Sequence, residues 1–329
     1  MYQYIGIDVS KQSLQVYDGE KDSSFPNEPN LKAFHQFIQN KKEKNAEELV
    51  LIFEPTGVYS SILRKYCIRE NLKTKIVNPS QSAYFAKAIG NRSKTDKVDA
   101  KMLYSFSALL HDKDCRVPHE SEQASQLGAY INSYALLVTN ETGIKNHLRA
   151  AEQEGSITPD LLALLHTHLE QLEAMKEEIL QQTLVLIQAD PSLQRAMENI
   201  CSIPGVGKIN AIHLLYLFLK YPEANRAQLT ALAGLDPMIR ESGTSLHHRM
   251  KISKRGSHLL RRVLYCAAMS GVQHNAEWKG LYDAFLARGK QRQVILVAVM
   301  RKILLVSHAL YKENRPYEER GKNYKKNLN

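Results

Sequence analysis

The sequence predicts a mixed α/β domain at the N-terminus, followed by a largely helical remainder. Residues 4–10 alternate apolar and polar side chains as a half-buried strand does, and Leu49–Phe53 is a continuous apolar run typical of a buried parallel strand. Apolar residues recur at helical spacing from Gln126 to Ile187 and again in segments after Arg195. Because 329 residues exceed what one small core requires, we expect two or three domains.

The N-terminal elements can be placed in order. The strand at residues 4–10 and a second one around Leu14 and Val16 form a hairpin, and residues 26–30 form a loop. The further expected elements are an amphipathic helix with Leu31, Phe34, Phe37 and Ile38 on one face, the buried strand 49–53, a crossover helix from Tyr59, a strand at 73–77, a short helix from Asn78-Pro79 to Ala88, and a last helix after Thr95.

Four acidic residues fall at particular places in this pattern. Thr95 can cap a helix, which puts Asp96 and Asp99 one turn apart on a single face, with their β-carbons about 5 to 6 Å apart. Acids in a first helical turn also complement the helix dipole, so this pair alone has an ordinary structural explanation. Asp8 within a strand has none unless it is paired or bound to a metal. Glu54 follows a strand at the sheet edge where ligands bind in α/β folds.

Asp8, Glu54, Asp96 and Asp99 therefore offer the carboxylates of an RNase H-like, RuvC-like nuclease site. Hard divalent cations such as Mg²⁺ prefer oxygen ligands, and phosphoryl-transfer sites use them to polarise phosphate. We expect these four residues to be both metal ligands and catalytic residues.

Charge is distributed unevenly along the chain. Lysines and arginines number 18 against 14 acids in residues 1–119, 3 against 11 in 120–194, and 23 against 9 in 195–329. The basic excess in the last part predicts a polyanionic partner, whose phosphates release counterions when they are neutralised. The acidic middle part is expected to be scaffold.

The middle part predicts a helical hairpin or coiled coil. Leu162, Leu165, Leu169, Leu172, Ile179 and Leu186 follow a heptad seam that is interrupted by Lys176 and Thr183. Such a seam can pack within one chain, or it can form a contact between two chains, and the pattern leaves both alternatives open.

Residues 203–207, IPGVG, predict a helix-hairpin-helix element. Gly205 and Gly207 would let backbone N–H groups, the following helix N-terminus and Lys208 approach a phosphate. Any tight turn between helices can also use glycine, so the basic surroundings are what favour nucleic acid.

The segment 238–252 has no apolar period and is expected to be a loop. It carries Ser242-Gly243 among Arg240, Arg249 and Lys251, and Ser253 is expected to cap the next helix, which begins with Lys254 and Arg255. We expect these five cations to contact nucleic acid. A Ser-Gly pair in a loop is usually only a turn, so periodicity alone assigns Ser242 no role.

Cysteine usage and hydropathy indicate where such a chain works. Four cysteines stand singly, without a CxxC pair, which indicates a reducing compartment. No signal peptide is visible, and apolar runs such as Leu49–Phe53 and Val294–Met300 fall short of the roughly 18 residues of a membrane span. We therefore expect a soluble cytoplasmic protein with no membrane partner.

Several motifs together resemble one known family. GIDVSK at residues 6–11, EPTGVY at 54–59, Asn78-Pro79 and KTDKVDA at 94–100 resemble the N-terminal domain of DEDD insertion-sequence transposases. GLDP at 234–237, Ser242-Gly243 and ISKRG at 252–256 resemble the C-terminal domain of that family. The family includes bridge-RNA-guided recombinases and is related to Piv-type DNA invertases.

The resemblance implies a DNA recombinase that cuts and rejoins strands through a covalent phosphoserine. Ser242 corresponds in position to the nucleophile, and Mg²⁺ at the four acids assists it. The implied partners are double-stranded donor and target DNA, a structured non-coding guide RNA, and further copies of the chain in a dimer or tetramer. The implied location is the bacterial cytoplasm, at the nucleoid.

The expected domains are 1–119, an RNase H-like catalytic domain; 120–194, a coiled-coil and dimerisation region; 195–314, a helical transposase domain; and 315–329, a basic disordered tail. Two rival functions stay open. A Holliday-junction resolvase needs the acids and water but no serine, and a non-catalytic DNA-binding protein needs only the basic part.

Overall fold

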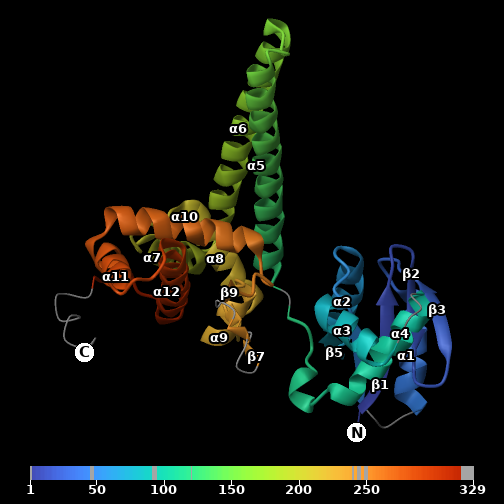
Figure 1. Cartoon of the computed structure of the whole chain (residues 1–329). Helices are drawn as coiled ribbons and strands as arrows, with labels where there is room; N and C mark the ends of the chain where they lie inside the picture. The colour runs from blue at the N-terminus through green and yellow to red at the C-terminus, as the bar shows by residue number, and fades with distance from the viewer. Residues whose placement is uncertain are drawn as a thin grey trace. The chain divides into compact units, whose positions relative to one another are not determined.

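The computed structural model describes residues 2–44, 48–90, 95–119, 121–238, 241–242, 246–247 and 251–319. The chain divides into two compact units, Met1–Glu120 and Ser121–Asn329, which Figure 1 shows in blue to teal and in green to red. Each unit is considered by itself below. Residues of the predicted middle and C-terminal domains share one core in the second unit. The division between these two domains stays a prediction.

The first unit contains a five-stranded sheet in the order β3-β2-β1-β4-β5. β1 pairs antiparallel with β2, and β2 with β3, whereas β1 with β4 and β4 with β5 are parallel. The strands are β1 (Tyr2–Val9), β2 (Ser13–Tyr17), β3 (Asp22–Pro26), β4 (Glu48–Phe53) and β5 (Lys73–Ile76). The predicted hairpin and parallel strands are confirmed. β3 was missed, because its sequence DSSFP is mostly polar and lies at the sheet edge, where no face of alternating apolar residues is needed.

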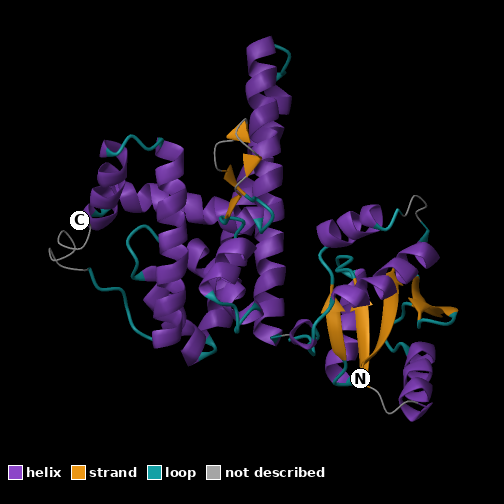
Figure 2. Cartoon of the chain, turned by 60° about the horizontal axis from the view of Figure 1, so that its bottom comes forward, coloured by secondary structure: helices purple, strands orange, loops and turns teal. Residues whose placement is uncertain are grey.

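Helices cover both faces of this sheet, as Figure 2 shows. α1 (Lys32–Lys44) and α2 (Tyr59–Arg69) bury Phe34 and Leu63 against the face that carries Ile5, Ile7 and Phe53. The opposite face carries Ile52, which packs with Met102 of α4 (Asp96–Ser105) and with Phe85 of α3 (Pro79–Ala88). Two short 3-10 turns, Phe106–Leu109 and Asp112–Asp114, complete the unit.

Gly6 in the middle of β1 determines how closely α4 approaches the sheet. A β-carbon at this position would lie 2.2 Å from the carbonyl oxygen of Ala100 and 2.4 Å from the backbone nitrogen of Tyr104. Any side chain would therefore collide with the helix backbone. A glycine inside a strand often marks such a close approach.

The second unit begins with a long helical hairpin of α5 (Glu122–Glu154) and α6 (Pro159–Gln188). Lys176 is 8% exposed and forms ion pairs with Glu141 of α5, at 2.6 Å, and with Glu173, at 2.5 Å. The buried Thr183 donates a hydrogen bond to the carbonyl of Ile179. Lys176 and Thr183 thus both have polar partners within the chain. This agrees with a seam that packs within one chain.

The rest of this unit is a helical core that includes the base of the hairpin. Leu127 and Ile187 of the hairpin share it with Leu214, Leu264 and Ile303. The helices are α7 (Pro191–Cys201), α8 (Lys208–Lys220), α9 (Arg226–Leu232), α10 (His258–His274), α11 (Ala276–Ala287) and α12 (Arg292–Glu313). Among the helices described, α12 has the length and composition of a membrane span, but half of its apolar window is buried within the unit, as in a core helix.

Two local predictions in this unit are wrong. Residues 237–252 contain short antiparallel ladders, β6 (Pro237–Met238) with β9 (Lys251–Ile252) and β7 (Glu241–Ser242) with β8 (Leu246–His247), where a loop was expected. Ladders of two residues are too short to give a period. Ser257, not Ser253, caps α10, because the Ser253 hydroxyl is bonded to Asp236 and Lys254 has a positive φ of 54° that excludes helix.

The segment after α12 also differs from the expected disordered tail. The backbone N–H of Tyr317 donates to Ser202 Oγ over 2.7 Å, and its ring stacks on Trp278 at 6.3 Å between centroids. Residues 315–319 are therefore bound to the helical core, and the expected tail begins too early. Residues 320–329 lie outside the described part of the chain.

We expect Gly6→Ala to lower the free energy of unfolding of the first unit by about 3 kcal/mol or more, because the methyl group must displace the α4 backbone. Urea denaturation followed by circular dichroism measures this. The matched control is Gly143→Ala in α5, where a β-carbon meets no atom within 4 Å, and a gain of up to about 1 kcal/mol is expected. Equal stability of Gly6→Ala and wild type would contradict the close approach of α4.

Candidate active site

The pairing of β1 with β4 brings two acidic residues side by side. The register joins Gly6 to Ile52 and Ile7 to Phe53, so one step further along the parallel strands places Asp8 beside Glu54. Side chains alternate between the faces of a sheet, and Ile52 belongs to the core under α4. Asp8 and Glu54 therefore leave the sheet on the face that α4 covers.

The other two acids come from the first turn of α4. Thr95 caps this helix, as predicted, and its Oγ1 accepts a hydrogen bond from Val98 N over 3.4 Å. The cap fixes Asp96 and Asp99 at the N-terminal end, where the helix dipole favours negative charge. Contact of Ala100 and Tyr104 with Gly6 then holds this end of the helix near the end of β1.

The other three carboxyl groups lie close enough to act on Asp8. The pKa of Asp8 is raised from 3.8 to about 6, first by burial and then by the negative charges of Asp96, Asp99 and Glu54. A hydrogen bond from the Val9 backbone opposes the shift only partly. The structure thus brings together the four predicted acids from three separate segments. Their roles as metal ligands and catalytic groups stay predictions.

The donor set fits a divalent cation by its chemistry. Four carboxylates meet at one edge of the sheet, and a cation between them would offset the burial and the repulsion that together raise the pKa of Asp8. In the part of the chain that the structure describes, no three His, Cys, Asp or Glu side chains converge closely enough to form a ready ligand set. The fit therefore rests on the donors and not on a preformed coordination geometry.

One residue at this edge was missed by sequence reasoning. The side-chain amide of Asn27 donates to the carbonyl of Ser10, over 2.8 Å, and to that of Tyr59, over 3.2 Å. It thereby joins the chain two residues beyond Asp8 to the first turn of α2. An isolated asparagine in a turn carries no sequence signal for such a contact, because the same residue type is common in turns for local reasons.

The IPGVG turn of the second unit packs against α10, and its predicted role in binding nucleic acid stays a prediction. Gly205 has a φ of 89°, and a β-carbon there would lie 2.4 Å from Gly271 N and 2.5 Å from the carbonyl oxygen of Ala267 in α10. Its lack of a side chain is therefore explained by internal packing. Gly207 and Lys208 are exposed at the start of α8, where backbone N–H groups and a cation can approach a phosphate.

The candidate serine belongs to the second unit. The backbone of Ser242 pairs with Leu246 in the short β7–β8 ladder, while Arg240 and Arg249 lie outside the described residues. Lys251, Lys254 and Arg255, also predicted to contact nucleic acid, are exposed. The acid cluster within the first unit does not include Ser242.

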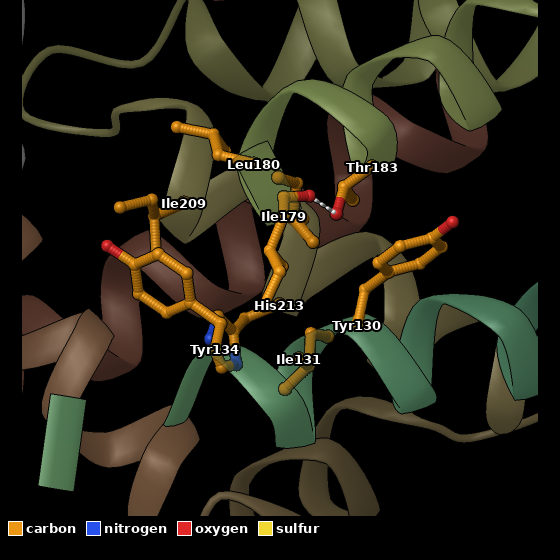
Figure 3. Close-up of a pocket in the computed structure, with 9 residues that line it drawn as sticks. Tyr130, Ile131, Tyr134, Ile179, Leu180, Thr183, Ile209 and His213 are labelled. Carbon is orange, nitrogen blue, oxygen red and sulfur yellow. Dashed lines mark hydrogen bonds between the residues drawn. The ribbon is translucent and has the colours of Figure 1, made fainter. Parts of the chain in front are cut away.

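The cavity in Figure 3 is lined by none of the predicted site residues and lies at the base of the α5–α6 hairpin. Its volume of about 20 Å³ holds little more than one water molecule. His213 points into it, and burial lowers the pKa of this imidazole to about 4, so that it is neutral at pH 7. The cavity is lined by Tyr130, Ile131, Tyr134, Ile179, Leu180, Thr183, Ile209, Ile212 and His213. It is a packing defect and not a substrate site.

Family models match both units. A DEDD transposase model of IS110 type matches residues 5–154, which include all four acids, and the model "Transposase IS116/IS110/IS902 family" matches residues 197–283. The chain belongs to the IS110 family of transposases. Membership implies a DNA-rearranging enzyme that binds DNA, and the DEDD domain implies a divalent metal ion.

Relatives of this IS110-family transposase agree with the models. This chain is 28% identical over 326 residues to the pilin gene-inverting protein of Moraxella bovis, and the match covers 96% of this chain and 98% of the relative. The pilin gene-inverting protein of Moraxella lacunata is similar to the same extent. The insertion element IS110 43.6 kDa protein of Streptomyces coelicolor is 29% identical over 167 residues, 50% of this chain and 38% of the relative.

The raised pKa of Asp8 predicts how stability depends on pH. The folded state binds this proton more tightly than the unfolded state, so the stability that it contributes is complete below pH 3.8 and is lost as the pH rises through about 6. In metal-free buffer at pH 7, we expect Asp8→Asn to be more stable than wild type by about 1 to 3 kcal/mol. Urea denaturation should show the difference vanish near pH 3.5. A less stable variant at pH 7 would refute the electrostatic account.

The exposed cation at the start of α8 predicts a salt effect. We expect Lys208→Gln to weaken DNA binding and to make the slope of log K against log salt shallower by about 0.9, the value for one lost phosphate contact. Fluorescence anisotropy with a labelled duplex at several NaCl concentrations measures the slope. Lys113→Gln, an exposed cation in the first unit, is the control. An unchanged slope for Lys208→Gln would remove this residue from the DNA contact.

Proposed function

We propose that this IS110-family transposase cuts and rejoins DNA strands at the cluster of Asp8, Glu54, Asp96 and Asp99, with Mg²⁺ as the metal. The observation that carries the proposal is that Asp8, partly buried at the carboxyl end of the parallel pair β1–β4, feels the negative charges of Asp96, Asp99 and Glu54. Such a cluster costs stability, and an enzyme retains it when function requires it. The DEDD transposase match spans the same residues.

The four carboxylates would hold the metal, and the structure gives each a defined support. Asp8 and Glu54 are held by adjacent strands, and Asp96 and Asp99 by the capped first turn of α4. When bound, the ion supplies positive charge that polarises the scissile phosphate and stabilises the leaving oxygen. Before it binds, burial and the charges of the other three acids make Asp8 take up a proton more readily.

Ser242 is the proposed nucleophile, by its correspondence with the serine of the family. Its Oγ would form a bond to phosphorus while the bond from phosphorus to the leaving strand oxygen breaks, and the serine proton is transferred in balance to that oxygen. The product is a phosphoserine ester that a strand hydroxyl can attack in the reverse sense. Its short hairpin is flanked in sequence by Arg240, Arg249 and Lys251, which can bind phosphate oxygens.

The partners follow from the same reasoning. The acids and Ser242 belong to different units, so catalysis requires the two kinds of unit to meet, in the family between protomers of a dimer or tetramer. Donor and target DNA and a structured guide RNA are the proposed nucleic acids. Inversion of a DNA segment is a second form of the reaction, favoured by the similarity to the two pilin gene-inverting proteins over nearly their whole length.

We expect Ser242→Ala to bind DNA normally but to form no covalent adduct, because the attacking oxygen is absent. Asp96→Asn should bind DNA yet lose strand transfer, because one ligand oxygen becomes an amide nitrogen or a weaker donor. The measurement is a denaturing gel of the full-length protein with labelled substrate DNA and guide RNA in Mg²⁺, in which the adduct is a shifted, protease-sensitive band.

Ser245→Ala, three residues further along the sequence, is the matched control and should form the adduct. A resolvase that uses water would still cut DNA in the Ser242→Ala variant, and a non-catalytic binder would cut in no variant. An adduct that survives Ser242→Ala would overturn the assignment of the nucleophile. Full strand transfer by Asp96→Asn would overturn the metal-site assignment.

A further inference from the structure

The loop that follows Glu54 presents apolar side chains to solvent. Val58 is 75% exposed and Tyr59 is 39% exposed. Single exposed apolar residues are common on protein surfaces. Two adjacent ones are informative here because of how rigidly they are held and where they lie.

Hydrogen bonds fix the loop in one conformation. Tyr59 N donates to the carbonyl of Thr56 over 3.1 Å, and the hydroxyl of Ser61 donates to that of Val58 over 2.6 Å. Gly57 has a positive φ of 53°, and the Ser60 hydroxyl donates to its carbonyl over 3.2 Å. The exposed pair is therefore presented by a structured turn, whose backbone loses little conformational freedom on binding.

The loop adjoins the acid cluster. Glu54 stands four residues before Val58, and its backbone carbonyl accepts a hydrogen bond from Thr56 N over 3.0 Å. Asn27 joins the carbonyl of Tyr59 to that of Ser10, two residues beyond Asp8. Both ends of the loop are thus tied to strand ends that carry catalytic carboxylates. Val58 and Tyr59 therefore lie close along the chain to the carboxylates at which a ligand would be held.

We propose that Val58 and Tyr59 form a contact for an unpaired base of the DNA strand held at the acid cluster. This inference rests on the proposed function, because that function brings a strand to the site. Lys11 and Lys97 are exposed and adjoin Ser10 and Asp96 in sequence, so they can bind the phosphates of the strand whose base contacts the apolar pair. Every base has a flat face that stacks on an aromatic ring, and apolar wedges separate neighbouring bases.

The test uses a forked DNA duplex that carries 2-aminopurine in its unpaired arm, with the full-length protein and Ca²⁺ in place of Mg²⁺. Stacking on Tyr59 should change the fluorescence of the base. Tyr59→Ala should abolish this change and weaken binding of the fork about fivefold or more, the lower end of the range for one stacked base. Binding of a fully paired duplex should not change. Tyr59→Phe, which keeps the ring, should behave as wild type.

The matched control for Val58→Ser is Leu109→Ser. Leu109 is 58% exposed in the same unit, beyond the other end of α4, and its replacement should change neither the fluorescence nor the affinity. If Tyr59→Ala and Val58→Ser bind the fork as wild type does, the base contact is refuted. It is also refuted if these variants instead alter self-association in sedimentation, since the loop would then be a protein interface. If the wild-type protein shows the fluorescence change but forms no adduct and cuts no substrate DNA with guide RNA in Mg²⁺, the proposed function is refuted and the base contact stands.

Discussion

The direct contact between the backbone of α4 and Gly6 is the constraint on which the acid cluster depends. At this point the helix lies so close to β1 that no side chain fits between them. The approach brings Asp96 and Asp99, at the capped end of the helix, to the edge of the sheet where Asp8 and Glu54 emerge from parallel strands. A larger residue at position 6 would move the helix, and two of the four carboxylates would move with it.

The cluster so formed is electrostatically unfavourable. Burial and three neighbouring carboxylates shift the pKa of Asp8 towards neutrality, so without a cation the folded protein carries a strain that the unfolded chain lacks. Apolar packing on both faces of the sheet offsets this unfavourable energy. Ile5, Ile7 and Phe53 pack on one face, and Ile52 and Met102 pack on the other. A stable core that supports an unfavourable cluster at its edge is typical of enzymes.

The second unit uses glycine in the same way as Gly6, to bring backbones together. Gly205 allows the turn before α8 to rest on α10, and a β-carbon at Gly256 would lie 2.0 Å from the carbonyl oxygen of Leu232. Arg261, one of the cations of α10, donates to the carbonyls of Ala233 and Gly256 and so holds this junction. Some glycines and cations of this unit therefore build the scaffold, and the predicted nucleic-acid contacts Gly207, Lys208, Lys254 and Arg255 are exposed.

The sequence by itself determined the elements whose signals are local. The alternation of residues 4–10, the apolar run Leu49–Phe53 and the Thr95 cap were each correct, because strand period, burial and capping depend on neighbouring residues. The order of these segments also predicted that Asp8, Glu54, Asp96 and Asp99 would meet. Only the tertiary structure decided that Gly6 sets the distance of α4, that Lys176 pairs with Glu141, and that Gly205 packs on α10. In each of these three contacts the partner is distant in sequence. The residues next to Gly6, Lys176 or Gly205 do not indicate which distant backbone or charge it contacts.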